Sequence, residues 1–378
     1  MIFDGTIKKH RAAAAVTAFV LLVTGCLSMC GCERNTSFDP LEGVETKVVQ
    51  DDTGREVTVP KEITKVAPSG QVAQMILVTL VPDLLVGLSV SPSTAQMEYY
   101  PEEVTYLPTF GQFYGKKSTL NLESLVEAEP QVTIDLGDRK RTIKIDLAGI
   151  QKKTNIPTLF YESTIEKMPE AYRFLGSLLG REERAEEMAA FVEKTLKMAE
   201  KNSAKIPDDR KLTVLFGTGA TGLEVNADGS SHAHVLDLVG ARNAIVPDVA
   251  TDKGGGTIVS LEEIYETEPD VIIQANHDLI RSMDKNEWAN LKAVREGKYY
   301  WIPQDPYSWM SAPPSINMVL GVWWLGQLLY PDIYNDYDMA EVAKEYYKLF
   351  WNYDLTDEQV QEFLEDSTVK ALKQSKAK

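Results

Sequence analysis

Several side chains in this sequence are of types that bind small molecules, and they follow short apolar runs that are typical of buried strands. Arg139, Lys140 and Arg141 form a basic cluster, and guanidinium groups suit carboxylate, phosphate and other oxyanion groups. A charged triplet is equally typical of a solvated face. Ser69 follows another apolar run, where a hydroxyl beside a helix N-terminus could also serve an oxyanion.

Aromatic residues form a second group of candidate ligand contacts. Phe110 and Tyr114 present faces that suit a flat or apolar chelate. Packing in the core is an equal alternative for Phe110, and it is less favoured for Tyr114, which is followed by Gly115 and two lysines. Trp309 lies beside Tyr307 in a proline-rich loop, and we expect it at a ligand cleft because such a loop has little core to reach.

His232 and His234 form the third candidate group. Residues i and i+2 share a face of a strand but not of a helix, so the pair converges only if its segment is extended. In that case the imidazoles could donate hydrogen bonds to a ligand or hold a metal. The alternative is that Ser231 caps the next helix and both histidines lie on its exposed first turn. Three scattered histidines after residue 33 are too few for a binder of free zinc or manganese.

Composition limits the classes of function that remain. The chain has 378 residues, 44% of them hydrophobic, which predicts a globular protein of about two domains. A net charge of −17 argues against nucleic acid as a partner, because little would neutralise the phosphates. The sequence contains no nucleophile elbow and no phosphate-binding loop, and it has no cysteine after residue 32. We therefore expect a binding protein that holds no cofactor, not an enzyme.

The N-terminal segment predicts export and lipid anchoring. A basic stretch precedes an apolar run from Ala12 to Gly25, which is too short to span a bilayer and suits a signal peptide at 1–25. Val23-Thr24-Gly25-Cys26 resembles a lipoprotein cleavage site, so we expect Cys26 to be lipidated, with Cys32 as the alternative. Two acyl chains would anchor the protein stably to the outside of the cell membrane, and 26–45 would be a flexible tether.

An internal repeat organises the rest of the chain. Leu122-Glu123 and Glu129-Pro130 recur as Leu261-Glu262 and Glu268-Pro269, at a constant offset of 139 residues. Each copy predicts a short helix, a proline that ends it, and a β-branched run typical of a parallel strand. Each copy is also flanked by a further strand on either side. The repeat therefore predicts two α/β lobes of like topology, at 46–162 and 205–370.

The smaller predicted elements position the candidate residues. In the first lobe we expect a hairpin over 46–60, a strand over 65–67, a helix over 71–80 and a buried strand over 84–90. In the second lobe we expect an apolar helix over 316–329, followed by helical segments that pack on that lobe and by a basic tail at 371–378.

A helical strut is predicted between the lobes, over 163–204. Ser163 and Glu166 have the spacing of a capping box, and Gly180 ends the first helix. A second helix over 182–202 carries glutamates in its first turns and lysines in its last, which complements the helix dipole.

These motifs, together with Gly229-Ser230-Ser231-His232 and Pro313-Pro314-Ser315, resemble the substrate-binding proteins of ABC importers for iron–siderophore, haem and cobalamin. The resemblance implies the class III periplasmic-binding fold, in which one long helix joins two lobes with mainly parallel sheets flanked by helices. It implies a monomer that binds an iron(III) chelate, haem or a corrinoid between the lobes and delivers it to an ABC permease dimer and its ATPase. Members of the family also place an aromatic near Tyr114.

The resemblance also implies a docking surface. Glu123 and Glu262 match positions where related proteins pair with arginines of the permease. The alternative is that both are ordinary carboxylates favoured by a helix N-terminus. Many relatives carry an arginine beside the two prolines where this chain has Ala312, which weakens the expectation of a strongly anionic ligand. An oxyanion such as molybdate or tungstate stays open as the alternative ligand.

Overall fold

A computed structural model describes residues 38–114, 118–247, 256–364 and 367. The predicted signal peptide, Cys26, Cys32 and the basic tail lie outside these residues. Within the described ranges, no helix is both long and apolar enough to cross a membrane. The terms first lobe and second lobe are kept for 46–162 and 205–370, whose boundaries stay predictions.

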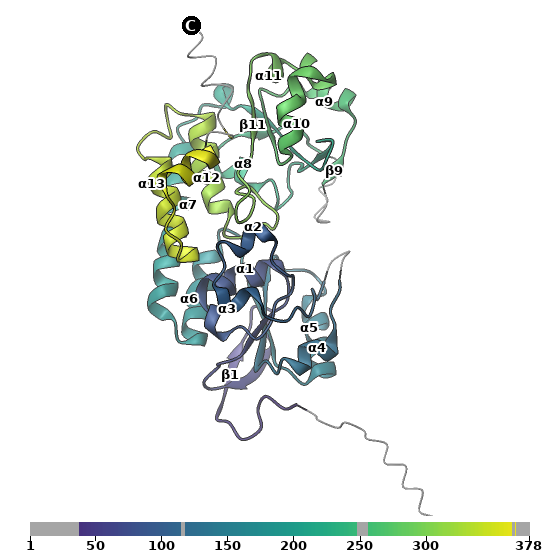
Figure 1. Cartoon of the computed structure of the whole chain (residues 1–378), viewed down its shortest axis with the longest axis vertical. Coiled ribbons are helices and arrows are strands. Elements are labelled where there is room, and N and C mark those ends of the chain that lie inside the picture. Colours follow the sequence, from purple (N-terminus) through teal and green to yellow (C-terminus); the bar gives the residue numbers. More distant parts are fainter. Residues whose placement is uncertain (1–37, 115–117, 248–255, 365–366, 368–378) are drawn as a thin grey trace, which may run out of the picture. The chain divides into compact units, whose positions relative to one another are not determined.

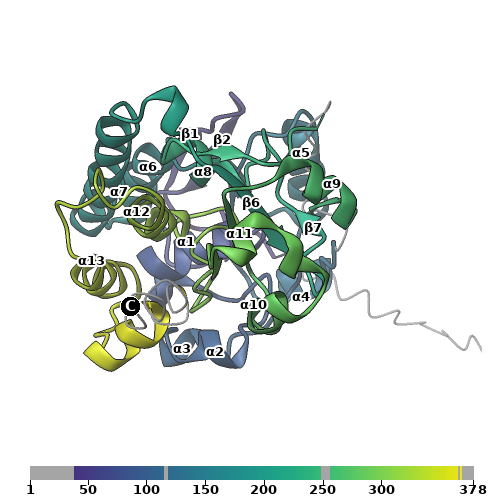
Figure 2. The ribbon, with the colours of Figure 1, turned by 90° about the horizontal axis from the view of Figure 1, so that it is seen from above.

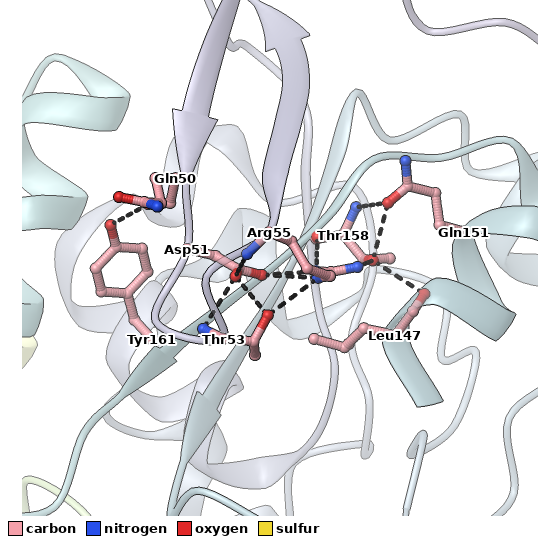
Figure 3. A network of polar contacts seen from close by, with 8 residues as sticks. All are labelled: Gln50, Asp51, Thr53, Arg55, Leu147, Gln151, Thr158 and Tyr161. Carbon is pink, nitrogen blue, oxygen red and sulfur yellow. Dashed lines mark hydrogen bonds and ion pairs between the residues drawn. The ribbon is translucent and has the colours of Figure 1, made fainter. Parts of the chain in front are cut away.

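The predicted hairpin is confirmed, and a buried ion pair fixes it to the first sheet. Strands β1 (Thr46–Gln50) and β2 (Glu56–Pro60) pair antiparallel. Beside the turn, Arg55 Nη2 lies 2.7 Å from Asp51 Oδ2 and also donates to the backbone oxygen of Thr158 (Figure 3). Removing one partner of such a buried pair leaves an uncompensated charge and costs about 3–5 kcal/mol.

The environment of Asp51 keeps its carboxylate charged. Burial alone would raise the pKa of Asp51, but hydrogen bonds from Thr53 and Arg55 hold that pKa below its ordinary value. On the other side of the hairpin, the Tyr161 hydroxyl donates to the backbone oxygen of Gln50 at 2.9 Å (Figure 3). The hairpin is therefore tied to the neighbouring strand at two points.

The first sheet is parallel, in the order β3-β4-β5. Its strands are β3 (Val66–Pro68), β4 (Val132–Gly137) and β5 (Thr158–Glu162). The helices of this lobe are α1 (Gln71–Leu80), α2 (Thr94–Met97), α3 (Glu102–Thr105), α4 (Leu122–Glu127) and α5 (Ile143–Thr154), with a 3₁₀ turn over Pro82–Leu84. Helix α1 has the bounds that the sequence predicts.

The strand predicted over 84–90 is wrong. Its residues make only isolated bridges, from Leu85 to Val66 and from Leu88 to Thr109. Pro82 begins a 3₁₀ turn that runs into this segment, and most of its apolar side chains are buried. A few backbone hydrogen bonds join it to its neighbours, from Val86 to Val66, from Leu88 to Pro108 and from Phe110 to Leu88, but they do not continue into a strand.

The strut consists of two helices, α6 (Met168–Leu179) and α7 (Glu182–Ser203), which pack against each other. Gly180 ends α6 with φ 68°, as its position predicts. The capping box is wrong, because α6 begins at Met168 and no side chain caps it. Ser163 is instead buried, and Glu166 bonds to His234.

The second sheet has the order β11-β10-β6-β7-β9, with β8 pairing with β6. Its strands are β6 (Thr213–Thr218), β7 (Glu224–Val225), β8 (Arg242–Asn243), β9 (Thr257–Ile258), β10 (Val271–Gln274) and β11 (Tyr299–Trp301). Its helices are α8 (His234–Leu238), α9 (Leu261–Thr267), α10 (His277–Ser282) and α11 (Lys292–Arg295), with 3₁₀ turns over Asp208–Arg210, Met283–Lys285 and Glu287–Asn290. Figure 1 shows α9, α10 and α11 grouped around this sheet.

The predicted repeat is confirmed down to the strand register. Thr133 of β4 pairs with Ala67 and Thr158, and Ile272, its equivalent in β10, pairs with Leu215 and Tyr299. Glu129 and Glu268, each directly before the proline, both adopt positive φ, at 51° and 41°. The mixed α/β fold with two mainly parallel three-strand cores is therefore as expected.

The C-terminal part packs around the strut. It contains α12 (Met318–Leu329), α13 (Met339–Tyr346), a π-helical turn over Tyr347–Trp351 and a helical stretch over 357–364. Helix α12 lies between α7 and α13, as Figure 2 shows. The expectation that this part packs on the second lobe is incomplete, because it also contacts α1 and α7.

Candidate ligand-binding site

A cavity of about 320 Å³ is lined by residues of both lobes and of the turn that enters the strut. In the first lobe, Asp138 follows the end of β4, and at the strut entrance Thr164 follows the end of β5. In the second lobe, Ser230 and Ser231 precede α8. Ligands of open α/β sheets bind at the carboxyl ends of the strands, which is where Asp138 and Thr164 lie. The other described lining residues are Ile165, Glu166, Gly229, His234, Asp237, Pro314 and Met318.

One wall of the cavity is a charged cluster that joins the strut entrance to the second lobe. His234 Nε2 bonds to Glu166 Oε1, and His234 Nδ1 lies 3.3 Å from Asp237 Oδ2. Hydrogen bonds to Asp237 and Glu166 raise the pKa of His234 to about 10, so the imidazole is a cation at neutral pH. The hydrogen bond from His234 in turn lowers the pKa of Glu166. His234 is thus the sole cation among the described lining residues, beside three carboxylates.

A second hollow, of about 540 Å³, runs along α6 and α7. It shares Glu166 and Asp237 with the cavity but is otherwise lined mostly by the strut, including Arg173, Glu193 and Glu200. Arg173 is already paired with Glu193 at 2.7 Å. No strand end of the first lobe is among its described lining residues, so the cavity is the better candidate for a site shared by both lobes.

His232 and His234 were expected to converge if their segment is extended, and the structure separates their roles. His232 Nδ1 bonds to the Ser311 hydroxyl, whereas His234 bonds to Glu166 and lines the cavity. No group of three or more metal-ligating side chains occurs in the described part of the chain. Neither histidine therefore belongs to such a group. Ser231 does not cap α8, which begins at His234 without a side-chain cap.

Ser69 is buried in the first lobe and is not among the residues found around the cavity. Its hydroxyl donates to Asp135 Oδ1, which lies on β4 and is 6% exposed. Burial raises the pKa of Asp135 to about 6, with the Ser69 hydrogen bond and Lys140 opposing the shift. Ser69 thus serves a buried carboxyl group of this sheet.

Replacing Asp135 by asparagine is expected to change how stability depends on pH. A folded-state pKa of about 6 exceeds the ordinary value of 3.8, so the contribution of this group is full below pH 3.8 and falls as pH rises to about 6. Asparagine does not ionise. The stability of Asp135→Asn relative to the wild type should therefore be about 2 kcal/mol more favourable at pH 8 than at pH 4. Urea unfolding at both pH values measures this difference.

The exposed Asp138→Asn variant is the control for this measurement, because its carboxyl is not buried in the sheet. It should show little change between the two pH values. Equal relative stabilities of Asp135→Asn at pH 4 and pH 8 would mean that Asp135 titrates as an ordinary carboxyl group.

Phe110 and Tyr114 also lie apart from the described cavity lining. Phe110 is 1% exposed and belongs to a small core cluster with Leu125. This agrees with the alternative that Phe110 packs in the core. Tyr114 is half-buried, and the Lys140 amine lies 4.3 Å from the centre of its ring. Arg139 is exposed and is not among the described lining residues, although its neighbour Asp138 is.

Tyr307 and Trp309 are buried, at 5% and 1% exposure. The Tyr307 hydroxyl lies 2.5 Å from that of Tyr100 in the first lobe. Trp309 packs against Phe363, and its ring nitrogen donates to the backbone oxygen of Asp305 at 3.3 Å. The expectation that Trp309 has little core to reach is therefore wrong, because the C-terminal helical stretch supplies that core.

Sequence reasoning missed Thr164, Glu166 and Asp237 as candidate site residues. Thr164 and Glu166 follow the end of β5, so the rule that ligands bind at strand ends would have found them. Glu166 was assigned instead to a helix cap. Asp237 lies three residues after His234 on α8, so the i, i+3 spacing of a helix could have found it.

Glu123 and Glu262 lie in the first turns of α4 and α9 and are exposed. Asn121 and Ser260 cap these two helices from equivalent positions. Neither glutamate lines the cavity or takes part in an ion pair found among the described residues. Their docking role stays a prediction.

Comparison with known proteins identifies the family to which the chain belongs. A family model described as periplasmic binding protein matches residues 76–306. The Fe(3+)-citrate-binding protein YfmC of Bacillus subtilis is 22% identical over 300 residues, covering 76% of this chain and 89% of the relative. The molybdate-binding protein MolA of Haemophilus influenzae is 24% identical over 259 residues, covering 63% of this chain and 71% of the relative.

Among solved structures, an ABC transporter solute-binding protein from Sulfurospirillum deleyianum is similar, with a TM-score of 0.77 and 27% identity, covering 84% of this chain and 99% of that one. The matched region contains both copies of the repeat and the strut. These relatives are extracytoplasmic solute-binding proteins and not enzymes. The chain therefore belongs to the periplasmic binding protein family, as a solute-binding protein of the ABC-transporter class.

Proposed function

We propose that this protein is anchored to the outer face of the cell membrane through Cys26, or else Cys32, and captures a metal chelate between its two lobes. It would deliver the chelate to an ABC permease dimer, with Glu123 and Glu262 as docking residues. The Fe(3+)-citrate-binding and molybdate-binding relatives support a metal-containing solute. Ser69, Phe110, Tyr114, Arg139, His232, Tyr307 and Trp309 stay candidate contacts only for a ligand larger than the cavity.

The charge of the cavity lining carries the proposal about the ligand. The described lining holds three carboxylates, Asp138, Glu166 and Asp237, and one imidazolium, His234, and it includes no lysine or arginine. A unit negative charge about 4 Å from a carboxylate costs about 4 kcal/mol at an effective dielectric constant of 20. Thr164, Ser230 and Ser231 add hydroxyl groups. The lining therefore favours a hydrophilic chelate that is neutral or positively charged, such as an iron(III) trihydroxamate or a corrinoid. Either chelate is larger than the cavity, which would enclose only part of it.

Haem and oxyanions fit this lining less well. Haem carries two carboxylates on a flat apolar ring, and the described lining offers no aromatic face. The relation to a molybdate-binding protein favours an oxyanion as the second candidate, for which the hydroxyls and His234 could donate hydrogen bonds. The three carboxylates count against that candidate.

Calorimetric titration of the purified protein with five probes tests this proposal. The probes are ferrioxamine B, cyanocobalamin, haem, iron(III) citrate and molybdate. We expect one of the first two to bind at least tenfold, or about 1.4 kcal/mol, more tightly than the anionic probes. Asp138→Asn should reduce the difference in affinity between these chelates and the anionic probes. Glu127→Gln, on the exposed side of α4, should leave that difference in affinity unchanged. Tightest binding of molybdate or iron(III) citrate would overturn the ligand class, and no binding of any probe would count against the proposed function.

A further inference from the structure

Three aromatic rings from separate parts of the chain form one stack. The Trp351 ring lies 5.6 Å from that of Tyr100, at an interplanar angle of 20°, and 5.9 Å from that of Tyr307, at 26°. Tyr100 belongs to the first lobe and Tyr307 to the second, and their hydroxyls lie 2.5 Å apart. Trp351, from the C-terminal segment, therefore contacts both lobes where they touch.

The same C-terminal segment makes further contacts with the first lobe. The Tyr353 hydroxyl donates to Glu98 Oε1 at 2.8 Å, and Gln359 Nε2 donates to the same oxygen at 3.1 Å. The ring of Tyr99 lies 5.5 Å from that of Tyr347 and 4.8 Å from that of Tyr353. These contacts place residues 347–359 against the loop between α2 and α3.

The segment is also attached to the strut. Phe350 packs against Tyr172 of α6, with ring centres 6.0 Å apart. Arg184 of α7 donates to the backbone oxygen of Leu349 at 3.3 Å and to that of Thr79, in α1, at 2.7 Å. The segment follows directly after α13, and α13 packs on α12, which in turn packs on α7 of the strut. It lies beyond residues 76–306, which the family model matches.

We propose that residues 347–359, in the C-terminal part of the second lobe, form a second connection to the first lobe beside the strut, and that Trp351 is its positioning residue. The segment keeps Tyr100 and Tyr307 in contact. It therefore fixes the distance between the cavity wall that contains Asp138 and the wall that contains Ser231. This inference rests on the proposed ligand site for its functional meaning. Its test needs no ligand, so it can fail independently of the ligand class.

Hydrogen–deuterium exchange of the full chain, read by mass spectrometry, tests the connection. Trp351→Ala should raise exchange about tenfold or more in peptides over 94–105 and 303–311, on opposite sides of the contact. Trp351→Phe keeps a ring in the stack and should restore exchange to near the wild-type rate. The control Trp323→Phe removes the 2.7 Å hydrogen bond from Trp323 to Thr195, so its effect should stay near α7 and α12.

A milder variant covers the case in which Trp351→Ala fails to fold. Tyr353→Phe removes only the hydroxyl bonded to Glu98, and it should raise exchange over 94–105 without lowering the melting temperature as far as Trp351→Ala. The proposal is overturned if Trp351→Ala or Tyr353→Phe raises exchange only within 339–364. That result would mean that the segment packs on the second lobe and does not stabilise its contact with the first lobe.

Discussion

Replacing Glu123 and Glu262 together by alanine is expected to abolish most uptake while leaving ligand affinity nearly unchanged. Both carboxylates are exposed in the first turns of equivalent helices, and neither lines the cavity. Two partly desolvated ion pairs with a permease would contribute about 2–5 kcal/mol to docking. Their loss should lower uptake at least about 30-fold. Such surface changes should cost about 0.5 kcal/mol of stability or less.

The matched control is Glu127→Ala with Glu266→Ala. These two residues are also exposed, lie one turn further along the same helices, and are related by the same repeat. Uptake by whole cells and calorimetric titration of purified protein separate docking from ligand binding. If the control pair lowered uptake as much as the first pair, a general loss of acidic charge would explain the effect. If the first pair weakened ligand binding with normal uptake, both glutamates would be assigned to the wrong surface.

Filling the cavity with a large side chain is expected to remove ligand binding. Ser231 lines the cavity just before α8, and an indole at this position would occupy much of the 320 Å³. Ser231→Trp should weaken binding of the tightest probe by roughly 100-fold, or about 2.7 kcal/mol. Ser282→Trp places the same side chain on the exposed end of α10 and should bind normally. Unchanged affinity in Ser231→Trp, measured by calorimetry, would show that the ligand lies elsewhere.

The fold could be predicted in detail because its signals are local and occur twice. The helix, proline and strand pattern around Glu129-Pro130 recurs at Glu268-Pro269, so each copy supported the interpretation of the other. Gly180 marked the end of α6 by the left-handed conformation that such a position requires. The failure over 84–90 has a local cause, since an apolar run that is buried on all sides has the same composition whether or not it pairs.

The candidate site could be predicted less well because its members depend on contacts far apart in sequence. Trp309 is buried by Phe363, more than fifty positions away, so no property of the Trp309 loop indicates its burial. Glu166 has the spacing from Ser163 that a capping box requires, but its position is determined by its hydrogen bond to His234. His234 was identified by its type alone. Its raised pKa follows from Asp237, three residues further along α8, and from Glu166, which no spacing rule brings to it.

The most direct test of the account is the position of the metal in a crystal of the complex. The iron or cobalt chelate that binds most tightly in the titration would be soaked or co-crystallised, and anomalous scattering measured at the absorption edge of its metal. The account predicts one strong peak in the cavity, between Thr164 of the strut entrance and Ser231 of the second lobe. A peak in the hollow along α6 and α7, beside Glu193 and Glu200, or on the outer surface of one lobe would contradict it.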